Sequence, residues 1–281
     1  MIQTPKISIV IPCYNEEDYI KGCLDAVMRQ TVSPYEVIVV DNNCTDKTAK
    51  IAKSYDFVHV FKEKRKGIFY SRQTAMNKAS GDIVCRIDAD TQIDKDWVKR
   101  AAQIFADESV MAASGPMGYH DFLFTRFSRA VVHVFLVGAR LLGYTFLFGC
   151  NMAIRKSAWG IVEPELCNDI KSFEDMDIAT HLERHGLKIV YDKHLKATAS
   201  IRRAEDNPIE FFDYITRYSY TAEKHHKPIL PARYAEVSFL IGYGLSKIIL
   251  MFYDTKQKRF TRSKLRDKSL KRLNPMLTDH D

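Results

Sequence analysis

Short β-branched runs alternate with longer segments of helical spacing over the first 90 residues. The runs suit buried strands, and the segments between them repeat apolar residues every three or four positions, which indicates helices. The predicted strands are Ile7–Ile11, Glu36–Val40, Val58–Phe61 and Asp82–Ile87. The predicted helices are Glu16–Gln30, Thr45–Tyr55 and Gly67–Ser80, and we expect Gly81 at the C-terminal cap of the third.

This alternation predicts an α/β fold in which helices flank a mostly parallel central sheet. Ligands of such sheets bind beyond the carboxyl ends of the strands. Tyr14, Asn15, Glu16, Asp41 and Asp88 fall at those ends. Three separate segments are therefore expected to direct polar groups into one crevice.

A strongly apolar stretch follows at residues 126–148. It carries Arg126, His133 and Arg140 at seven-residue spacing, with Arg129 nearby, so a helix here would have one basic stripe. The pattern fits a helix packed on the core with a solvated basic edge. It also fits a surface helix beside an anionic or membrane-borne acceptor.

A second apolar stretch covers Val237–Tyr253. Its length and the internal Lys247 make it a poor membrane-spanning helix. Ser238, Gly242 and Ser246 share one helical face, where small side chains would let another helix or a symmetry mate approach. This stretch therefore also allows a homo-oligomer.

The net charge of +7 is concentrated at the C-terminal end. Residues 224–281 hold 13 Lys/Arg and 5 Asp/Glu, whereas the other 223 residues hold 29 and 30. Nine basic residues between 256 and 272 directly follow the second apolar stretch, a pattern typical of peripheral association with an anionic membrane. A solvated tail without a partner is the plain alternative. No nucleic-acid partner is expected, because the segment lacks interleaved aromatic residues and a known binding module.

We accordingly divide the chain into an α/β domain at 1–223 and a helical, basic extension at 224–281. The composition, with 27% charged and 46% apolar residues, excludes a disordered or collagen-like chain. The first apolar run is too short for a secretory signal, and the six cysteines show no paired spacing. These features favour a cytoplasmic protein with reduced thiols, at the inner face of the cell membrane.

Asp88-Ala89-Asp90 ends the fourth predicted strand and places two carboxylates on one side of it. Mg²⁺ and Mn²⁺ prefer oxygen ligands and commonly bridge carboxylates to substrate phosphates. Two aspartates in a surface turn would look the same. With Thr91 the run also fits the nucleophile motif of haloacid-dehalogenase-like phosphatases, although that motif usually opens its domain.

Two further acidic positions give this motif a context. Asp41 ends a strand ahead of a helix, where a carboxylate can accept from a base N–H. Glu174 and Asp175 stand among aromatic and aliphatic residues, which raise a carboxyl pKa and suit a general base. An acidic helix N-terminus that complements the helix dipole is the alternative for this pair.

Taken in order, these segments resemble the motifs of glycosyltransferase family 2 over roughly residues 5–220. The matching segments are Ile11-Pro-Cys-Tyr-Asn-Glu16, Val40-Asp41 with Asp46 and Thr48, Gly67, Ser71-Arg72, Gly81-Asp82, Asp88-Ala89-Asp90, Gly149-Cys-Asn-Met-Ala153 and Glu174-Asp175. The resemblance implies a GT-A fold, a nucleotide-diphosphate sugar donor with UDP or GDP favoured, Mn²⁺ or Mg²⁺, and inversion at the anomeric carbon.

The resemblance also implies roles for individual residues. Pro12, Tyr14, Glu16, Asp41 and Asn43 would line the nucleoside pocket, and Arg72 would lie near the nucleotide. Asp88 and Ala89 would contact the donor, and Asp90 would hold the metal with Asp88 beside it. Asp175 would deprotonate the acceptor, Glu174 would bind hydroxyls, and Asn151 would lie in the floor under the sugar.

Two departures from the family pattern change this expectation. The histidine that many members place about 25 residues after the Glu-Asp pair is replaced by Thr198-Ala-Ser-Ile-Arg-Arg203, so Arg202 or Arg203 could neutralise the diphosphate instead. The Gln-x-x-Arg-Trp motif of processive synthases is reduced to Tyr214 and Arg217-Tyr218, which favours a single transfer per encounter.

The sequence therefore predicts an inverting glycosyltransferase that acts on an acceptor hydroxyl of a glycan or a lipid-linked sugar. The phosphatase is the main alternative enzyme. A nucleotidyltransferase is disfavoured because Pro12-Cys-Tyr-Asn-Glu-Glu17 is not a Gly-rich, basic loop. A catalytically inactive interaction module is the alternative that is not an enzyme.

Overall fold

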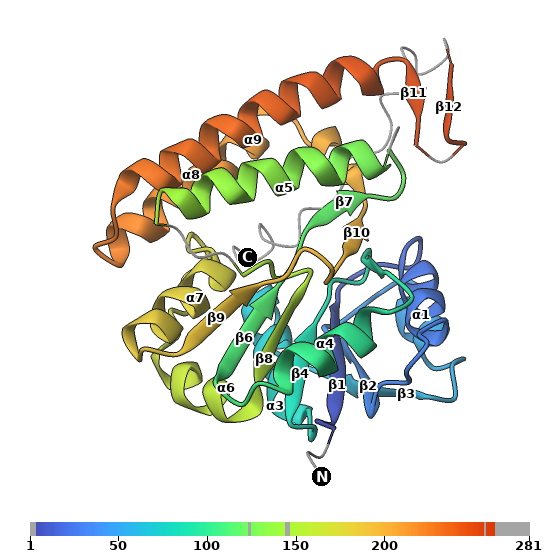
Figure 1. Cartoon of the computed structure of the whole chain (residues 1–281). Helices are drawn as coiled ribbons and strands as arrows, with labels where there is room; N and C mark the ends of the chain where they lie inside the picture. The colour runs from blue at the N-terminus through green and yellow to red at the C-terminus, as the bar shows by residue number, and fades with distance from the viewer. Residues whose placement is uncertain (1–3, 123–124, 144–146, 256, 262–281) are drawn as a thin grey trace.

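A seven-stranded sheet forms the centre of the molecule in the computed structural model, which describes residues 4–122, 125–143, 147–255 and 257–261 (Figure 1). The strand order is β3-β2-β1-β4-β8-β6-β9. The strands are β1 (Ile7–Cys13), β2 (Glu36–Asp41), β3 (Val58–Lys62), β4 (Ile83–Arg86), β6 (Val110–Ser114), β8 (Met152–Arg155) and β9 (Lys188–Tyr191). The first four strands pair in parallel, as the sequence predicts.

Alternate residues of these strands are buried under helices on both faces of the sheet. Ile9 and Ile11 pack toward α1 (Ile20–Met28), α2 (Thr48–Ala52) and α4 (Trp97–Phe105). Val10 and Val84 pack toward α3 (Ile68–Lys78), α6 (Lys156–Val162) and α7 (Glu174–Arg184). Burial on both faces explains why these strands read as continuous apolar runs.

The strand β8 divides the sheet into two parts. It runs antiparallel to both β4 and β6, whereas β6 and β9 pair in parallel with each other. The sheet is therefore mixed but mostly parallel. The end of β4 lies beside the start of β8, so the segments after Arg86 and before Met152 meet at one edge.

Several predicted boundaries shift where loop chemistry competes with helix formation. The strand β1 continues through Pro12 to Cys13, and α1 begins at Ile20 rather than at Glu16. Gly81 does not cap α3, whose C-cap is Ala79. Gly81 instead lies close to β1, where a Cβ on this residue would stand 2.6 Å from the Ser8 hydroxyl oxygen.

A second layer covers the carboxyl edge of the sheet (Figure 1). It consists of α5 (Thr125–Leu141), α8 (Pro208–Lys224) and α9 (Ile229–Leu250), joined to the sheet through β5 (Gln92–Ile93), β7 (Met117–Tyr119) and β10 (Ala197–Ala199). Short 3₁₀ turns at Glu163–Glu165 and Ile201–Glu205 and the hairpin of β11 (Tyr253–Asp254) and β12 (Arg259–Phe260) complete the fold. The proposed boundary at 223/224 falls at the end of α8, which packs on α9.

The amphipathic pattern of α5 is oriented differently from the plain prediction. Arg129 pairs with Asp94 at 3.3 Å, and the His133 ring lies 2.7 Å from the Tyr191 hydroxyl, so these two basic residues face the layer of the sheet, whereas Arg140 is exposed. Val134 and Leu141 are 68% and 84% exposed instead. The side chain of Arg126 lies outside the described residues.

The helix α9 carries a similar apolar stripe, with Val237, Ile241, Leu245 and Ile248 all exposed. No helix in the described part of the chain combines the length and the apolar character needed to cross a bilayer. Most of the basic cluster between 256 and 272 lies outside the described residues. All six cysteines are free.

Candidate active site

The loops after β1 and β2 meet at the carboxyl edge of the sheet, where a nucleoside pocket is predicted. Cys13 and Asp41 are register partners, which brings Pro12, Tyr14 and Asp41 to one place. The Asp41 carboxylate accepts from the Cys44 N–H at 2.7 Å. Pro12, Tyr14 and Asp41 are all half-buried.

Two asparagines with positive φ shape these loops. Asn15, at φ 52°, accepts from the Thr45 N–H at 2.8 Å and so joins the two loops. Asn43, at φ 62°, donates its amide to the carbonyl oxygens of Glu63 and Lys64. The structure thus gives Asn43 a loop-supporting contact near the predicted pocket.

Asp88 and Asp90 follow β4 directly, as predicted. The Asp88 side chain is 37% exposed, whereas Asp90 is buried. The Asp90 carboxylate lies 2.9 Å from Nε of Arg202, and its backbone carbonyl is 3.1 Å from Nε2 of His120. One aspartate thus faces solvent while the other is held by the protein.

Arg202 connects Asp90 to the loop after β1. Its two terminal nitrogens lie 2.6 and 2.8 Å from the Glu16 carboxylate, and its guanidinium stacks over the Tyr19 ring. Although burial alone would lower the pKa of Arg202, Asp90 and Glu16 raise it above the ordinary value. Arg202 is therefore a permanent cation beside the Asp-x-Asp motif.

A second chain of charges links the Asp-x-Asp motif to the acidic pair on α7. Arg72 lies 2.8 Å from one Glu174 oxygen and 3.9 Å from Asp88, and the fully buried Arg86 lies 2.7 Å from the other Glu174 oxygen. Burial would lower the pKa of Arg72, but Glu174 and Asp88 raise it. The buried Glu174 carboxylate thus holds two arginines, which favours a positioning role over a direct contact to a hydroxyl.

Asp175 lies next to this chain at the N-terminus of α7. One carboxylate oxygen accepts from the Gly149 N–H at 3.1 Å and the other from the Met176 N–H at 3.0 Å. Burial raises the pKa of Asp175, and Arg86, the Gly149 N–H and Arg72 oppose that rise. A half-buried, oriented carboxylate with a raised pKa is suited to take a proton near neutral pH.

The Gly149 peptide, which donates to Asp175, is itself held by Arg86. Its carbonyl accepts from Nε of Arg86 at 3.1 Å, and a Cβ at Gly149 would stand 2.3 Å from a terminal nitrogen of Arg86. Only glycine leaves room for this arginine. Two residues later, the fully buried Asn151 accepts from the Trp97 indole and donates to the Leu195 carbonyl, so its amide supports the floor from below.

Four residues from different elements gather around the Asp175 side of the crevice. Arg203 stacks over the Tyr214 ring with 3.9 Å to its centroid. Burial raises the pKa of Cys150, as do Asp88, Asp90 and Asp175, and burial likewise raises the pKa of Tyr119 to about 12. Because three carboxylates act on one thiol, negative charge is concentrated at this point.

Arg86 is the main site residue that the sequence analysis missed. It interrupts the buried strand Ile83–Arg86, and a charged residue in such a run needs a buried partner. That signal was present in the sequence. His120 gave no comparable signal, because only the pairing of β7 with β10 brings it to Asp90.

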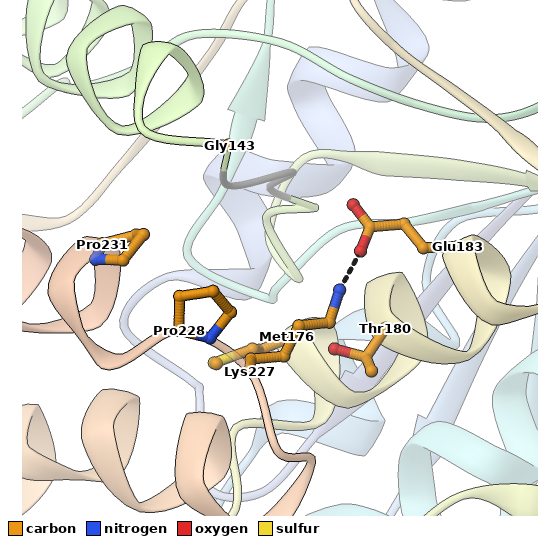
Figure 2. Close-up of a pocket in the computed structure, with 7 residues that line it drawn as sticks. All are labelled: Gly143, Met176, Thr180, Glu183, Lys227, Pro228 and Pro231. Atoms are coloured by element: carbon orange, nitrogen blue, oxygen red, sulfur yellow. Dashed lines mark hydrogen bonds and ion pairs between the residues drawn. The ribbon is translucent and has the colours of Figure 1, made fainter.

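A hollow between α7 and the start of α9 lies apart from these carboxylates (Figure 2). It is lined by Gly143, Met176, Thr180, Glu183, Lys227, Pro228 and Pro231. Its one lining carboxylate, that of Glu183, is paired with Lys227. The chemistry for a nucleotide sugar therefore lies in the acidic crevice and not here.

The acidic crevice fits a hard divalent cation. Asp88 and Asp90 offer carboxylate oxygen donors in the turn that follows β4, and oxygen is the ligand that such cations prefer. A cation there would share Asp90 with Arg202, which already contacts that carboxylate.

Comparisons with known proteins agree with this arrangement. A family model described as "Glycosyl transferase family 2" matches residues 8–160, more than half of the chain. The glycosyltransferase AglE of Haloferax volcanii is 34% identical over 118 residues, which are 40% of this chain and 39% of that protein. An N-acetylglucosaminyltransferase of Azorhizobium caulinodans is 28% identical over 122 residues, 41% of this chain and 31% of that protein. The chain thus spans well under half the length of these relatives.

Solved structures show the same fold over most of the chain. The mannosyltransferase PcManGT from Pyrobaculum calidifontis, in complex with GDP-Man and Mn²⁺, has a TM-score of 0.63 at 20% identity and covers 89% of this chain and 75% of its own. Residues 1–349 of S. aureus TarS, in complex with UDP-GlcNAc, have a TM-score of 0.59 at 20% identity, covering 88% and 75%.

The α/β sheet and the acidic motifs at its carboxyl edge define a glycosyltransferase with a GT-A fold. The chain belongs to glycosyl transferase family 2. The resemblance found in the sequence is thereby confirmed, and the phosphatase and nucleotidyltransferase alternatives are excluded.

Proposed function

We propose that this protein transfers a sugar from a nucleotide-diphosphate donor, with UDP or GDP as the nucleotide, to an acceptor hydroxyl with inversion at the anomeric carbon. The observation that carries the proposal is the Arg72–Glu174–Arg86 chain, which joins Asp88 on the donor side to Asp175 on the acceptor side. It fixes the two acidic motifs, which lie far apart in the sequence, relative to each other.

Asp175 serves as the general base. Its carboxylate is oriented by two backbone N–H groups, and its raised pKa increases its affinity for a proton. The proton of the acceptor hydroxyl passes to Asp175 while that oxygen attacks the anomeric carbon. The bond from that carbon to the diphosphate breaks in the same displacement, and the electron pair leaves with the nucleoside diphosphate.

The donor lies across the loops after β1, β2 and β4. Pro12, Tyr14 and Asp41 contact the nucleoside, with the Asp41 carboxylate accepting from the base. Asp88 and Ala89 contact the ribose and sugar. Glu16 and Asn43 also have contacts within the protein: Glu16 holds Arg202, and Asn43 supports the loop after β3.

The leaving diphosphate meets positive charge from Arg202, with Arg203 next to it. Arg202 is held by Asp90 and Glu16 and presents a guanidinium beside the donor site, where phosphate oxygens match its geometry. Mn²⁺ or Mg²⁺ bound through Asp90 and Asp88 would supply further Lewis-acid stabilisation of the leaving group. Mn²⁺ is present in the PcManGT complex.

The acceptor is carried on an anionic membrane surface. The helices α5 and α9 of the layer over the sheet edge both carry exposed apolar side chains. Exposed cations lie at Arg140 on α5 and at Lys258 and Arg259 in the β11–β12 hairpin that follows α9. An apolar face flanked by positive charge complements the headgroup region of an anionic leaflet. We therefore propose a lipid-linked acceptor, at the inner face of the cell membrane, over a free glycan.

A donor screen tests whether the protein binds and uses a nucleotide sugar. Purified protein is incubated with UDP-, GDP- and dTDP-sugars and Mn²⁺, and both the thermal midpoint and the release of nucleoside diphosphate are measured. We expect the sugars of one nucleotide to raise the thermal midpoint of the protein and to release their nucleoside diphosphate slowly. If the whole panel leaves the midpoint unchanged and releases no nucleotide, the chain is an inactive member of its family.

A further inference from the structure

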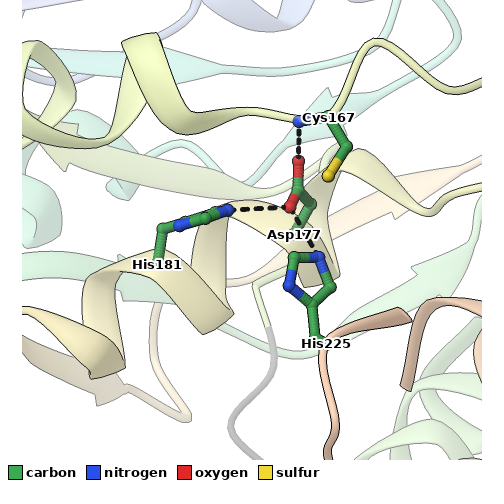
Figure 3. Close-up of side chains that lie close together, drawn as sticks. All are labelled: Cys167, Asp177, His181 and His225. Atoms are coloured by element: carbon green, nitrogen blue, oxygen red, sulfur yellow. Dashed lines mark hydrogen bonds and ion pairs between the residues drawn. The ribbon is translucent and has the colours of Figure 1, made fainter. Parts of the chain in front are cut away.

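Four side chains that can bind a metal converge beside α7 (Figure 3). They are Cys167, Asp177, His181 and His225, and their ligand atoms all lie within 4.8 Å of one another. Asp177 and His181 are one turn apart on α7, Cys167 lies in the loop before it, and His225 follows the end of α8. Three segments thus contribute to one cluster.

Three of the four side chains are buried, and the three atoms with which these side chains face one another lack hydrogen bonds. The other Asp177 oxygen, Oδ2, accepts from the Cys167 N–H at 2.7 Å. Asp177 has no exposed surface, and His181 and His225 are 5% and 6% exposed. One Asp177 oxygen, Oδ1, lies 3.2 Å from Nε2 of His181 and 2.7 Å from Nε2 of His225. None of these three atoms has a partner in hydrogen-bonding geometry, although each faces the others. Buried polar atoms arranged in this way need a proton or a cation between them.

The tautomer of His181 favours a cation. Its Nδ1 lies 2.8 Å from a Glu165 carboxylate oxygen, which can only accept, so we assign the ring proton to Nδ1. A neutral His181 ring then presents the lone pair of Nε2 to the Asp177 oxygen. A carboxylate that fixes a histidine in this tautomer is a common outer-shell arrangement of metal sites.

We propose that Cys167, Asp177, His181 and His225 bind one Zn²⁺ as a structural site. Two imidazole nitrogens, one thiolate and one carboxylate form a four-ligand set of the kind that zinc prefers. The thiolate and the carboxylate balance the charge of the ion.

This site is chemically separate from the donor site. Asp88 and Asp90 offer oxygen donors, which suit Mn²⁺ or Mg²⁺, whereas this cluster adds two nitrogens and one sulfur to a single carboxylate. Asp177 lies two residues after the proposed base Asp175. Next to it, the Phe173 N–H donates to the Thr221 hydroxyl on α8 at 2.9 Å. The ion would therefore fasten the base-bearing helix to the layer formed by α8 and α9.

Metal content of untagged protein tests the proposal without depending on activity. The protein is purified without chelators, dialysed against metal-free buffer and analysed by elemental mass spectrometry. We expect about one zinc ion per chain. Cys167→Ala and His225→Ala should lose it. His185→Ala should retain it, because His185 shares Glu165 with His181 but does not point into the cluster. Asp90→Ala should also retain it, which separates the two metal sites.

Cobalt substitution keeps the test decisive if the cluster variants do not fold. Co²⁺ bound to wild-type protein should give the visible bands of a tetrahedral site together with a thiolate charge-transfer band, and Zn²⁺ should displace it. A chelator should lower the thermal midpoint of wild-type protein. The proposal would be overturned if wild-type protein retained no Zn²⁺, gave no cobalt spectrum and kept the same thermal midpoint with Zn²⁺ or with a chelator. The cluster would then be a protonated histidine network instead.

Discussion

Arg202 binds the second carboxylate of the Asp-x-Asp motif: its Nε lies 2.9 Å from Asp90, while its terminal nitrogens hold Glu16. The family pattern has a histidine in this part of the chain, and the sequence indicated that Arg202 or Arg203 could take its place. This sequence instead places a guanidinium there, which cannot lose its charge at physiological pH. The donor site thus contains a fixed cation whether or not a metal is bound.

Arg202→Gln should weaken binding of a nucleoside diphosphate but not of the corresponding nucleoside. A charge-assisted contact to phosphate is worth about 1.5–3 kcal/mol, so we expect about a 10- to 100-fold rise in the Kd for UDP or GDP. Calorimetry with both ligands gives the comparison. Arg203→Gln is the matched control and should have a smaller effect, because Arg203 stacks on Tyr214. Equal losses for nucleoside and nucleoside diphosphate would mean that Arg202 shapes the pocket instead.

Asp175→Asn should abolish transfer while leaving donor binding largely intact. General-base catalysis contributes about 10²- to 10⁴-fold, and the amide keeps the shape of the side chain without its proton affinity. Single-turnover rates and donor Kd values are measured side by side. Asp107→Asn changes an exposed carboxylate at the far end of β6 and serves as the control. Near-wild-type turnover of Asp175→Asn would remove this residue from the mechanism.

The acid limb of the pH–rate profile should lie above the range of an ordinary aspartate, whose pKa is about 3.9. Burial raises the pKa of Asp175, and the base works only when ionised, so activity is lost as pH falls through this raised value. The sign for stability is opposite: the buried charge costs folding free energy above the raised pKa, and that cost is relieved as pH falls.

Arg72→Gln provides a test of this assignment. Arg72 is one of the groups that oppose the rise in the Asp175 pKa, so its loss should move the acid limb of kcat/KM to still higher pH. An acid limb that stays in place in Arg72→Gln would show that another group controls it.

Arg86→Met should destabilise the fold by about 3 kcal/mol or more, because it leaves a buried carboxylate with half of its compensation. Arg86 is fully buried and also holds the Gly149 carbonyl. Urea unfolding measures the change. Arg100→Met is the control: Arg100 forms a more exposed ion pair with Asp192, and its loss should cost less than about 1 kcal/mol. Similar losses for both variants would contradict the argument from burial.

Ile241→Asp together with Leu245→Asp should release the protein from anionic vesicles. Both side chains are exposed on α9, and burying one aliphatic side chain contributes about 1.5–3 kcal/mol, or about 10- to 100-fold in partitioning. Co-sedimentation with phosphatidylglycerol vesicles measures this, with neutral phosphatidylcholine vesicles alongside. Met28→Asp alters an equally exposed apolar residue on α1 and should have no effect. If wild-type protein sediments with neither type of vesicle, the proposed association with a membrane surface is excluded.

The parallel half of the sheet could be predicted from local pattern alone. Its strands are continuous β-branched runs separated by helical spacing, and parallel topology then places Asp41 and Asp88 at one edge. The apolar period also predicted α5. It could not indicate which face of that helix meets solvent, because periodicity defines a face and not what covers it.

The long-range contacts could not be predicted in this way. Glu16 and Arg202 are 186 residues apart, and Arg86 and Glu174 are 88 apart, so only the assembled sheet brings them together. The cluster around Asp177 shows the same limit: Asp177 and His181 are visible as a helical pair, but Cys167 and His225 reach them from separate segments. The helix α1 begins at Ile20, after a turn in which the Glu16 carbonyl accepts from the Tyr19 and Ile20 N–H groups.

The family match ends shortly after the antiparallel junction between β4 and β8. The family match covers residues 8–160 and therefore includes both strands of that junction, whereas the proposed base and the helices α8 and α9 lie beyond it. A recombination point after β8 would keep the loops after β1, β2 and β4 and exchange the segment that carries Asp175 and Arg202. Chimeras joined there offer a direct route to new acceptor preferences on one donor scaffold, provided that the incoming segment supplies its own partners for Arg86 and Asp90.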